Sequence, residues 1–211
     1  MVSYSEYARR GFFELCFVSL INLAVIISLN LFCKDNSSGA RPRSVKAMTC
    51  ILSVFTLLLI ITAVSKMVMY INIYGLTLLR VYTTWFMALL FIVFTGIILK
   101  LIIPKINLSK LTVTAFTVMF GALSFCNVDG LIAKYNISGY TSGSLEYFSV
   151  SMLSELSSGA APEIKELMDS TNNADEKAQL EKILHNMQKS KDIRTLTASD
   201  IILEKILSAN E

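Results

Sequence analysis

The chain has 211 residues, of which 54% are hydrophobic and only 17% carry a charge. Soluble domains carry about 25% charged residues, so this composition argues against an ordinary soluble globular protein. The formal net charge is only +3 and no Lys/Arg-rich run occurs, so we expect no nucleic-acid partner.

The charge is divided unevenly along the chain. Residues 1–136 hold 12 basic and 4 acidic side chains, a net charge of +8. Residues 137–211 hold 7 basic and 12 acidic side chains, a net charge of −5. We therefore expect a basic transmembrane region over 1–136 and an acidic, helical, water-soluble tail over 137–211.

Four stretches of 18 or 19 residues contain no charged residue: 15–33, 47–65, 81–99 and 111–128. Crossing about 30 Å of hydrocarbon takes about 20 helical residues. The fold class predicted is all-α: a polytopic membrane protein with four transmembrane helices followed by a small helical tail. The expected spans are about 12–33, 47–70, 80–102 and 110–128.

Turn and capping residues predict how these segments are joined and how the tail is organised. Gly75 is the expected turn residue between the second and third spans. In the tail we expect one helix over 145–156, a second with Pro162 in its first turn, and a third capped by Asn173 and reaching about residue 189. Thr197 is expected to cap a last helix.

The lysine and arginine bias predicts the orientation in the membrane. The linker 34–46 and the loop 100–110 together hold seven basic residues, against four or five on the opposite side. This places both connections in the cytoplasm of a bacterial cell and both termini, with the tail, outside the cytoplasmic membrane. Arg9 and Arg10 directly before a span are an opposing signal, and they also match a twin-arginine export signal, which four long spans disfavour.

Ionisable groups at membrane depth are costly, so they are candidate functional residues. Glu14 lies one turn after Arg10 and can pair with it. Lys66 and Arg80 flank the turn between spans two and three, with Asp129 as a candidate counter-ion. Lys66 and Arg80 are either snorkelling cations within a belt of aromatic residues or part of a pocket for an anionic group. The whole candidate polar cluster comprises Arg10, Glu14, Lys66, Tyr70, Tyr74, Thr77, Arg80, Tyr82, Asn127, Asp129, Tyr135 and Asn136.

Patterns of catalytic and metal-binding residues are missing from the sequence. There is no GxSxG, P-loop, HExxH or GxGxxG motif, and four cysteines without CxxC spacing accompany a single histidine, His185. We therefore expect no metal and no cofactor, and we assign no catalytic residue.

Four ordered segments resemble a bacterial multipass family, domain of unknown function 4173, and its relative 4153. They are Tyr-Ala-Arg-Arg-Gly-Phe-Phe at 7–13, the segment 65–82 with Tyr-Gly-Leu-Thr at 74–77, Asn-Val-Asp-Gly-Leu-Ile-Ala-Lys-Tyr-Asn at 127–136, and 143–162. The tail departs from the family pattern at Ser149, Ile193 and Thr197. The resemblance implies an integral membrane location, assigns no activity, and suggests the C-terminal portion of a longer protein.

Two classes of function fit these observations. The first is a non-enzymatic scaffold, interaction or sensing protein, whose spans anchor the acidic tail. The second is a membrane carrier or lipid-handling enzyme with an anionic-group pocket at Lys66 and Arg80. The first is favoured, because catalytic patterns are missing. The expected partners are the lipid bilayer and either an anionic lipid or a membrane protein.

Overall fold

The computed structural model describes residues 4–32, 42–145, 147–171, 173–189, 199–200 and 202–203, with side chains given from residue 10 onward except for 188 and 189. Every regular element within these ranges is a helix, which confirms the all-α fold class.

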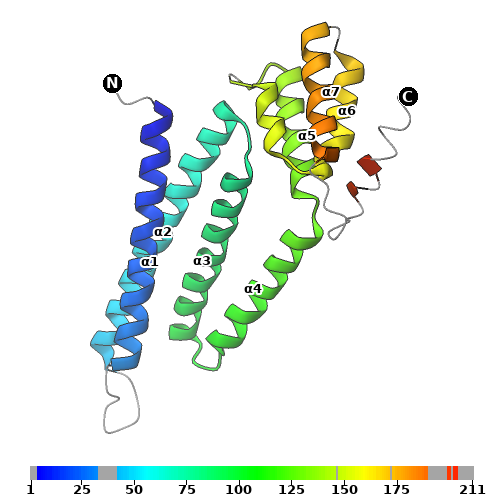
Figure 1. Cartoon of the computed structure of the whole chain (residues 1–211). Helices are drawn as coiled ribbons and strands as arrows, with labels where there is room; N and C mark the ends of the chain where they lie inside the picture. Colours follow the sequence, from blue (N-terminus) through cyan, green and yellow to red (C-terminus); the bar gives the residue numbers. More distant parts are fainter. Residues whose placement is uncertain are drawn as a thin grey trace. The chain divides into compact units, whose positions relative to one another are not determined.

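Four of the helices are long and apolar enough to cross a membrane. They are α1 Tyr4–Phe32, α2 Arg43–Tyr74, α3 Leu78–Ile102 and α4 Leu108–Phe125 (Figure 1). Most of them extend beyond the uncharged runs, because helix formation continues through Arg10, Lys66 and Arg80. The turn between α2 and α3 contains Gly75 with φ of 74°, a left-handed conformation that glycine adopts without strain.

The chain divides into two compact units. One contains Met1–Tyr70 and Arg80–Ala122 and is called here the four-helix unit. The other contains Ile71–Leu79 and Leu123–Glu211 and is called the tail unit. The turn between α2 and α3 therefore belongs to the tail unit, although it lies between two long helices in the sequence.

Within the four-helix unit, α1 packs on a stripe of α2 residues whose spacing alternates between four and three. This stripe consists of Thr49, Ser53, Thr56, Ile60, Ala63 and Met67, all of them buried. Such spacing is the heptad repeat of a helix pair, and small polar residues let two apolar helices approach closely. The Asn22 amide on α1 donates a hydrogen bond of 2.9 Å to the Thr56 hydroxyl.

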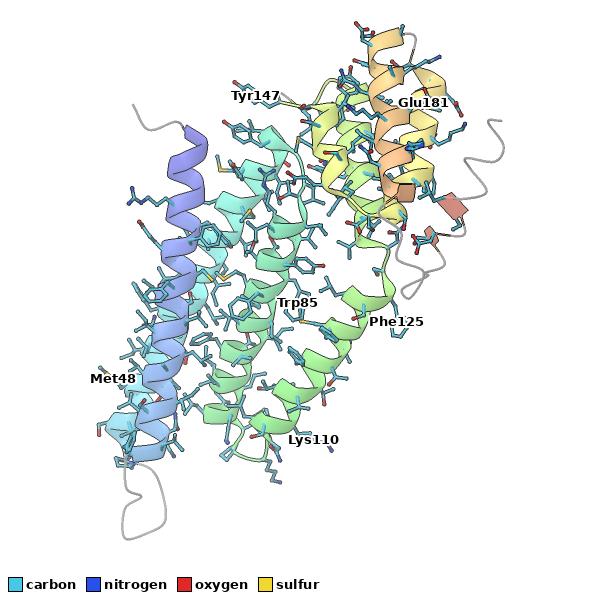
Figure 2. All side chains as sticks on the ribbon, viewed as in Figure 1. Met48, Trp85, Lys110, Phe125, Tyr147 and Glu181 are labelled. Carbon is cyan, nitrogen blue, oxygen red and sulfur yellow. The ribbon has the colours of Figure 1, made fainter. Side chains whose placement is uncertain are left out.

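Helix α4 packs on α3 through one face. The indole N–H of Trp85, which is labelled on α3 in Figure 2, donates to the carbonyl of Met119 at 3.1 Å, and its ring meets Phe116 edge-on. At the other end of the pair a Cβ on Gly96 would lie 2.7 Å from Leu111, so this glycine permits close approach. No residue of α4 is fully buried, which leaves its remaining faces for lipid or for another helix.

The tail unit consists of short helices around a small apolar core. They are α5 Val128–Thr141, the 3₁₀ turns η1 Val150–Glu155 and η2 Ser158–Ala160, α6 Ala161–Ser170 and α7 Ala174–Lys189. The core side chains come from every one of these elements, and each is at most 8% exposed: Ile132, Ala133, Leu153, Leu156, Ala160, Ala161, Ile164, Leu167, Leu180, Ile183 and Leu184.

The expected helices of the tail are confirmed in part. Pro162 lies in the first turn of α6, and Asn173 accepts a hydrogen bond of 3.1 Å from the Asp175 N–H at the start of α7. The helix expected over 145–156 is wrong, because only a 3₁₀ turn forms there. Its serines bond to one another and to nearby carbonyls, which competes with helix formation. The helix expected from Thr197 lies largely outside the described residues.

Candidate functional site

The tail unit contains a two-point contact between the side chain of Asn136 and the backbone of Leu76. The side-chain oxygen of Asn136 accepts from the Leu76 N–H at 2.7 Å, and its amide donates to the Leu76 carbonyl at 2.8 Å. Asn136 is 1% exposed, so both amide groups are used inside the fold. One side chain on α5 thus satisfies both polar groups of a turn residue that lies 60 positions earlier in the chain.

The neighbouring residues fit closely around this contact. A Cβ on Gly75 would lie 2.7 Å from the side-chain oxygen of Asn136, so only glycine suits both the space and the positive φ. Tyr74 stacks on Tyr147, which is labelled in Figure 2, with ring centroids 5.2 Å apart. The Tyr147 N–H donates to the Ile73 carbonyl. The α2–α3 turn is therefore in contact with two other segments of the tail unit, α5 and the residues around Tyr147.

Asn127 and Asp129 form a second polar contact, at the start of α5. Asn127 caps the helix by accepting from the Gly130 N–H at 3.0 Å, and its amide donates to the Gly159 carbonyl at 2.7 Å. The Ser157 hydroxyl donates to Asp129. A Cβ on Gly159 would overlap the Asn127 side-chain oxygen, so this glycine is required for the contact. The Asn-x-Asp pattern thus fastens the 157–160 turn to α5.

Two carboxylate oxygens near these contacts are buried and have no hydrogen-bond partner among the described residues. They are Oδ1 of Asp129 and Oε2 of Glu163. Both residues lie in the first turn of a helix, α5 and α6 respectively. The partial positive charge of a helix N-terminus stabilises a carboxylate there, which gives both side chains a structural reason for their position.

The remaining tail contact joins α5 to α7. The Tyr140 hydroxyl donates to one oxygen of Glu176 at 3.0 Å, and the Thr171 hydroxyl donates to the other at 2.8 Å. The hydrogen bond and the negative charge of Glu176 both raise the pKa of Tyr140 above its usual value. Tyr135, also on α5, donates to the Asn72 side chain at 3.3 Å.

The basic residues of the candidate polar cluster lie in the four-helix unit. Arg10 and Glu14 approach to 3.8 Å, but both side chains are at least 70% exposed, so the pair is weak. The Lys66 ammonium lies beside Gly11, where an added Cβ would be 3.3 Å from it. Arg80 lies 4.3 Å above the ring of Tyr70, a cation–π contact between α3 and α2.

The candidate polar cluster is thus shared equally between the two units. Arg10, Glu14, Lys66, Tyr70, Arg80 and Tyr82 belong to the four-helix unit, and Tyr74, Thr77, Asn127, Asp129, Tyr135 and Asn136 belong to the tail unit. Asp129 bonds to Ser157 within its own unit, and its pairing with Lys66 or Arg80 stays a prediction. That these twelve residues form one polar cluster stays a prediction.

Sequence reasoning missed the partners of these residues. Leu76 and Gly159 contribute backbone groups, Tyr147 contributes a ring, and Ser157 contributes a hydroxyl, and none of these groups matches a catalytic motif in the sequence. The signals available in the sequence are the glycines, Gly75 in the α2–α3 turn and Gly159 in the Gly-Ala-Ala-Pro run at 159–162. Within the described part of the chain, no group of three or more His, Cys, Asp or Glu side chains could hold a metal ion.

The fold and these contacts define an all-helical protein whose four long helices can span a membrane and whose tail unit is fastened together by asparagine and glycine contacts. Its sequence matches the family model described as Domain of unknown function (DUF4153) over residues 2–167, so the chain belongs to this family. The comparisons with curated proteins and with solved structures each found no match.

Proposed function

We propose that this chain is a membrane-embedded, non-enzymatic protein that presents its tail unit as an interaction or sensing module. The observation that supports this most directly is the use of Asn136, the most buried polar residue of the tail unit, to hold a backbone turn. An active site needs polar groups directed at a substrate. Here Asn127 and Asn136 are directed at the protein's own backbone.

The charge pattern supports the same proposal. The helices of the tail unit carry exposed charged residues on their outer faces, among them Lys177, Glu181 and Lys182 on α7. Exposed, rigidly held helix faces are common sites of protein recognition. We further propose a bacterial cytoplasmic membrane location with the tail outside the cytoplasm, following the lysine and arginine bias of the connections. Membership of the related family, domain of unknown function 4173, is part of the same proposal.

The experiment is site-specific photo-crosslinking of the full chain in the membranes of its own host. A photoreactive amino acid at Lys177 or Glu181 of α7 should give protein adducts of one discrete mass. The same group at Phe116 of α4, which is half exposed in the four-helix unit, should give lipid adducts instead. Asn136→Ala should abolish the protein adducts by loosening the tail unit. A ladder of unspecific adducts, or none at either α7 position, would refute the proposal.

A second candidate is a carrier or lipid-handling enzyme with an anionic-group pocket at Lys66 and Arg80. The contact of Arg80 with the Tyr70 ring favours it, since an aromatic wall beside a guanidinium suits a phosphate or carboxylate ligand. This candidate predicts that Lys66→Gln or Arg80→Gln abolishes activity while abundance and membrane insertion stay normal. Loss of abundance alone identifies both residues as structural anchors.

A further inference from the structure

One end of the four-helix unit has five basic side chains. Arg43 and Lys46 lie at the start of α2, Lys100 lies in the last turn of α3, Lys105 lies in the turn that follows, and Lys110 lies in the first turn of α4. Because α3 and α4 form a hairpin and α2 runs opposite to α3, these positions share one end of the unit (Figure 1). All five side chains are exposed, and we call them the basic rim.

The basic rim has no acidic partner in the described part of the chain. Among the side chains described in the four-helix unit, the one carboxylate is Glu14, which lies near the opposite end of α1 and pairs with Arg10. No ion pair joins any rim residue to another described residue. Five like charges at one end repel one another, so an external anion would stabilise this arrangement.

The positions of the rim residues on their helices strengthen this argument. The first turns of α2 and α4 contain no acidic residue, and they carry Arg43 and Lys110. A helix N-terminus is partially positive, so a cation there is unfavourable. In contrast, α5, α6 and α7 begin with acidic residues in the usual way. Helices α2 and α4 thus depart from the pattern that the tail helices follow.

Apolar side chains surround the rim at the same end of the unit. Leu31 and Phe32 at the end of α1, Met48 on α2 and Ile102 on α3 are between 60% and 85% exposed. These residues lie on helices long and apolar enough to cross a membrane, so we expect their side chains in hydrocarbon. Lysine and arginine stems place their charges at the adjoining headgroup layer. An apolar belt with a cationic edge fits the surface of a membrane leaflet that carries negative charge.

We infer that the basic rim binds anionic phospholipid headgroups, and that the four-helix unit selects them over zwitterionic ones. This inference does not depend on the proposed function, because no rim residue belongs to the tail unit. It also differs from the second candidate, because the basic rim lies at the opposite end of the spans from Lys66 and Arg80. Each basic residue near such a surface contributes about a fivefold preference for the anionic lipid.

The test is native mass spectrometry of the full chain released from nanodiscs made of equal parts phosphatidylglycerol and phosphatidylcholine with identical acyl chains. The wild type should retain mostly phosphatidylglycerol, and the retained excess should fall as salt is raised. The triple variant K100Q/K105Q/K110Q should lose most of that preference, on the order of a hundredfold if the three contributions add. K100R/K105R/K110R should keep it.

The matched control is K134Q/K177Q/K182Q, which removes the same charge from exposed positions of the tail unit. This control should retain phosphatidylglycerol like the wild type. Equal losses in both triple variants would show a net-charge effect and overturn the inference. So would a wild type that retains both lipids equally at low salt, a result that does not depend on any variant folding correctly.

Discussion

The side chain of Asn136 hydrogen-bonds both backbone groups of Leu76, which lies 60 residues earlier in the sequence. Its oxygen accepts from the Leu76 N–H at 2.7 Å, and its amide donates to the Leu76 carbonyl at 2.8 Å. The amide of Asn136 thus makes the same two hydrogen bonds to Leu76 that the backbone of a neighbouring β-strand would make. This contact explains why the turn between α2 and α3 is part of the tail unit. The segments 65–82 and 127–136, which both resemble the family in sequence, are thus joined to each other by this contact.

The first prediction concerns this contact. Asn136→Ala leaves two partly buried backbone groups of Leu76 without partners, which should lower the free energy of unfolding by about 2–4 kcal/mol. Denaturant unfolding of the full chain in mixed micelles measures it. Asn72→Ala is the control, because it removes an exposed side chain that only accepts from Tyr135, and its effect should stay within about 0.5 kcal/mol. Equal effects of the two variants would contradict the assignment.

The second prediction separates backbone strain from steric fit at the turn glycine. Gly75 and Gly143 both have positive φ, at 74° and 67°, but a Cβ at Gly143 meets open space. Gly143→Ala should therefore lower the free energy of unfolding only by the strain of a left-handed backbone, about 1–2 kcal/mol. Gly75→Ala should cost clearly more, because its Cβ also displaces Asn136. Unfolding of both variants under the same conditions makes the comparison, and a smaller cost at Gly75 would refute the close fit.

The third prediction concerns the packing of α1 on α2. Thr56→Val removes the hydroxyl that accepts from Asn22 while keeping the size of the side chain. It should lower the free energy of unfolding by about 0.6 kcal/mol. Ser53 is fully buried with no described hydrogen-bond partner for its hydroxyl, so Ser53→Ala should leave stability unchanged or raise it. The same unfolding assay ranks the two. A destabilised Ser53→Ala would mean that the hydroxyl has a partner in the folded protein.

The fourth prediction is a pH dependence. The pKa of Tyr140 is raised by Glu176, so the folded state keeps this proton to higher pH than the unfolded state does. The stabilisation is therefore present below the unfolded pKa of about 10 and is lost as pH rises through the folded value. Ultraviolet titration of the wild type minus Tyr140→Phe gives the curve of this tyrosine. Glu176→Gln should shift that curve to lower pH, and an unshifted curve would contradict the contact.

The fold class could be predicted because its causes are local. Uncharged runs of 18 or 19 residues require helices in lipid, and Asn173 and Pro162 mark helix starts by their own chemistry. The helix expected over 145–156 failed because clustered serines form local hydrogen bonds, a competition that apolar spacing does not reveal.

The contacts of the candidate site could be predicted only in part. The sequence identified Asn127, Asp129 and Asn136 as notable polar residues, but their partners are backbone groups of Gly159 and Leu76 and the hydroxyl of Ser157. Backbone groups are present at every residue and therefore leave no mark in the sequence. Only the glycines, which are required where two segments approach closely, indicate where such partners lie.

The central claim is that lipid surrounds α1 to α4, and Trp85, the single tryptophan of the chain, reports on it directly. The measurement is quenching of its fluorescence in vesicles by phospholipids with brominated acyl chains, compared with aqueous iodide. Strong quenching by the brominated chains and little by iodide is the expected result, because Trp85 lies within α3 against α4. Quenching by iodide alone would show that these helices are in water, and would contradict the account.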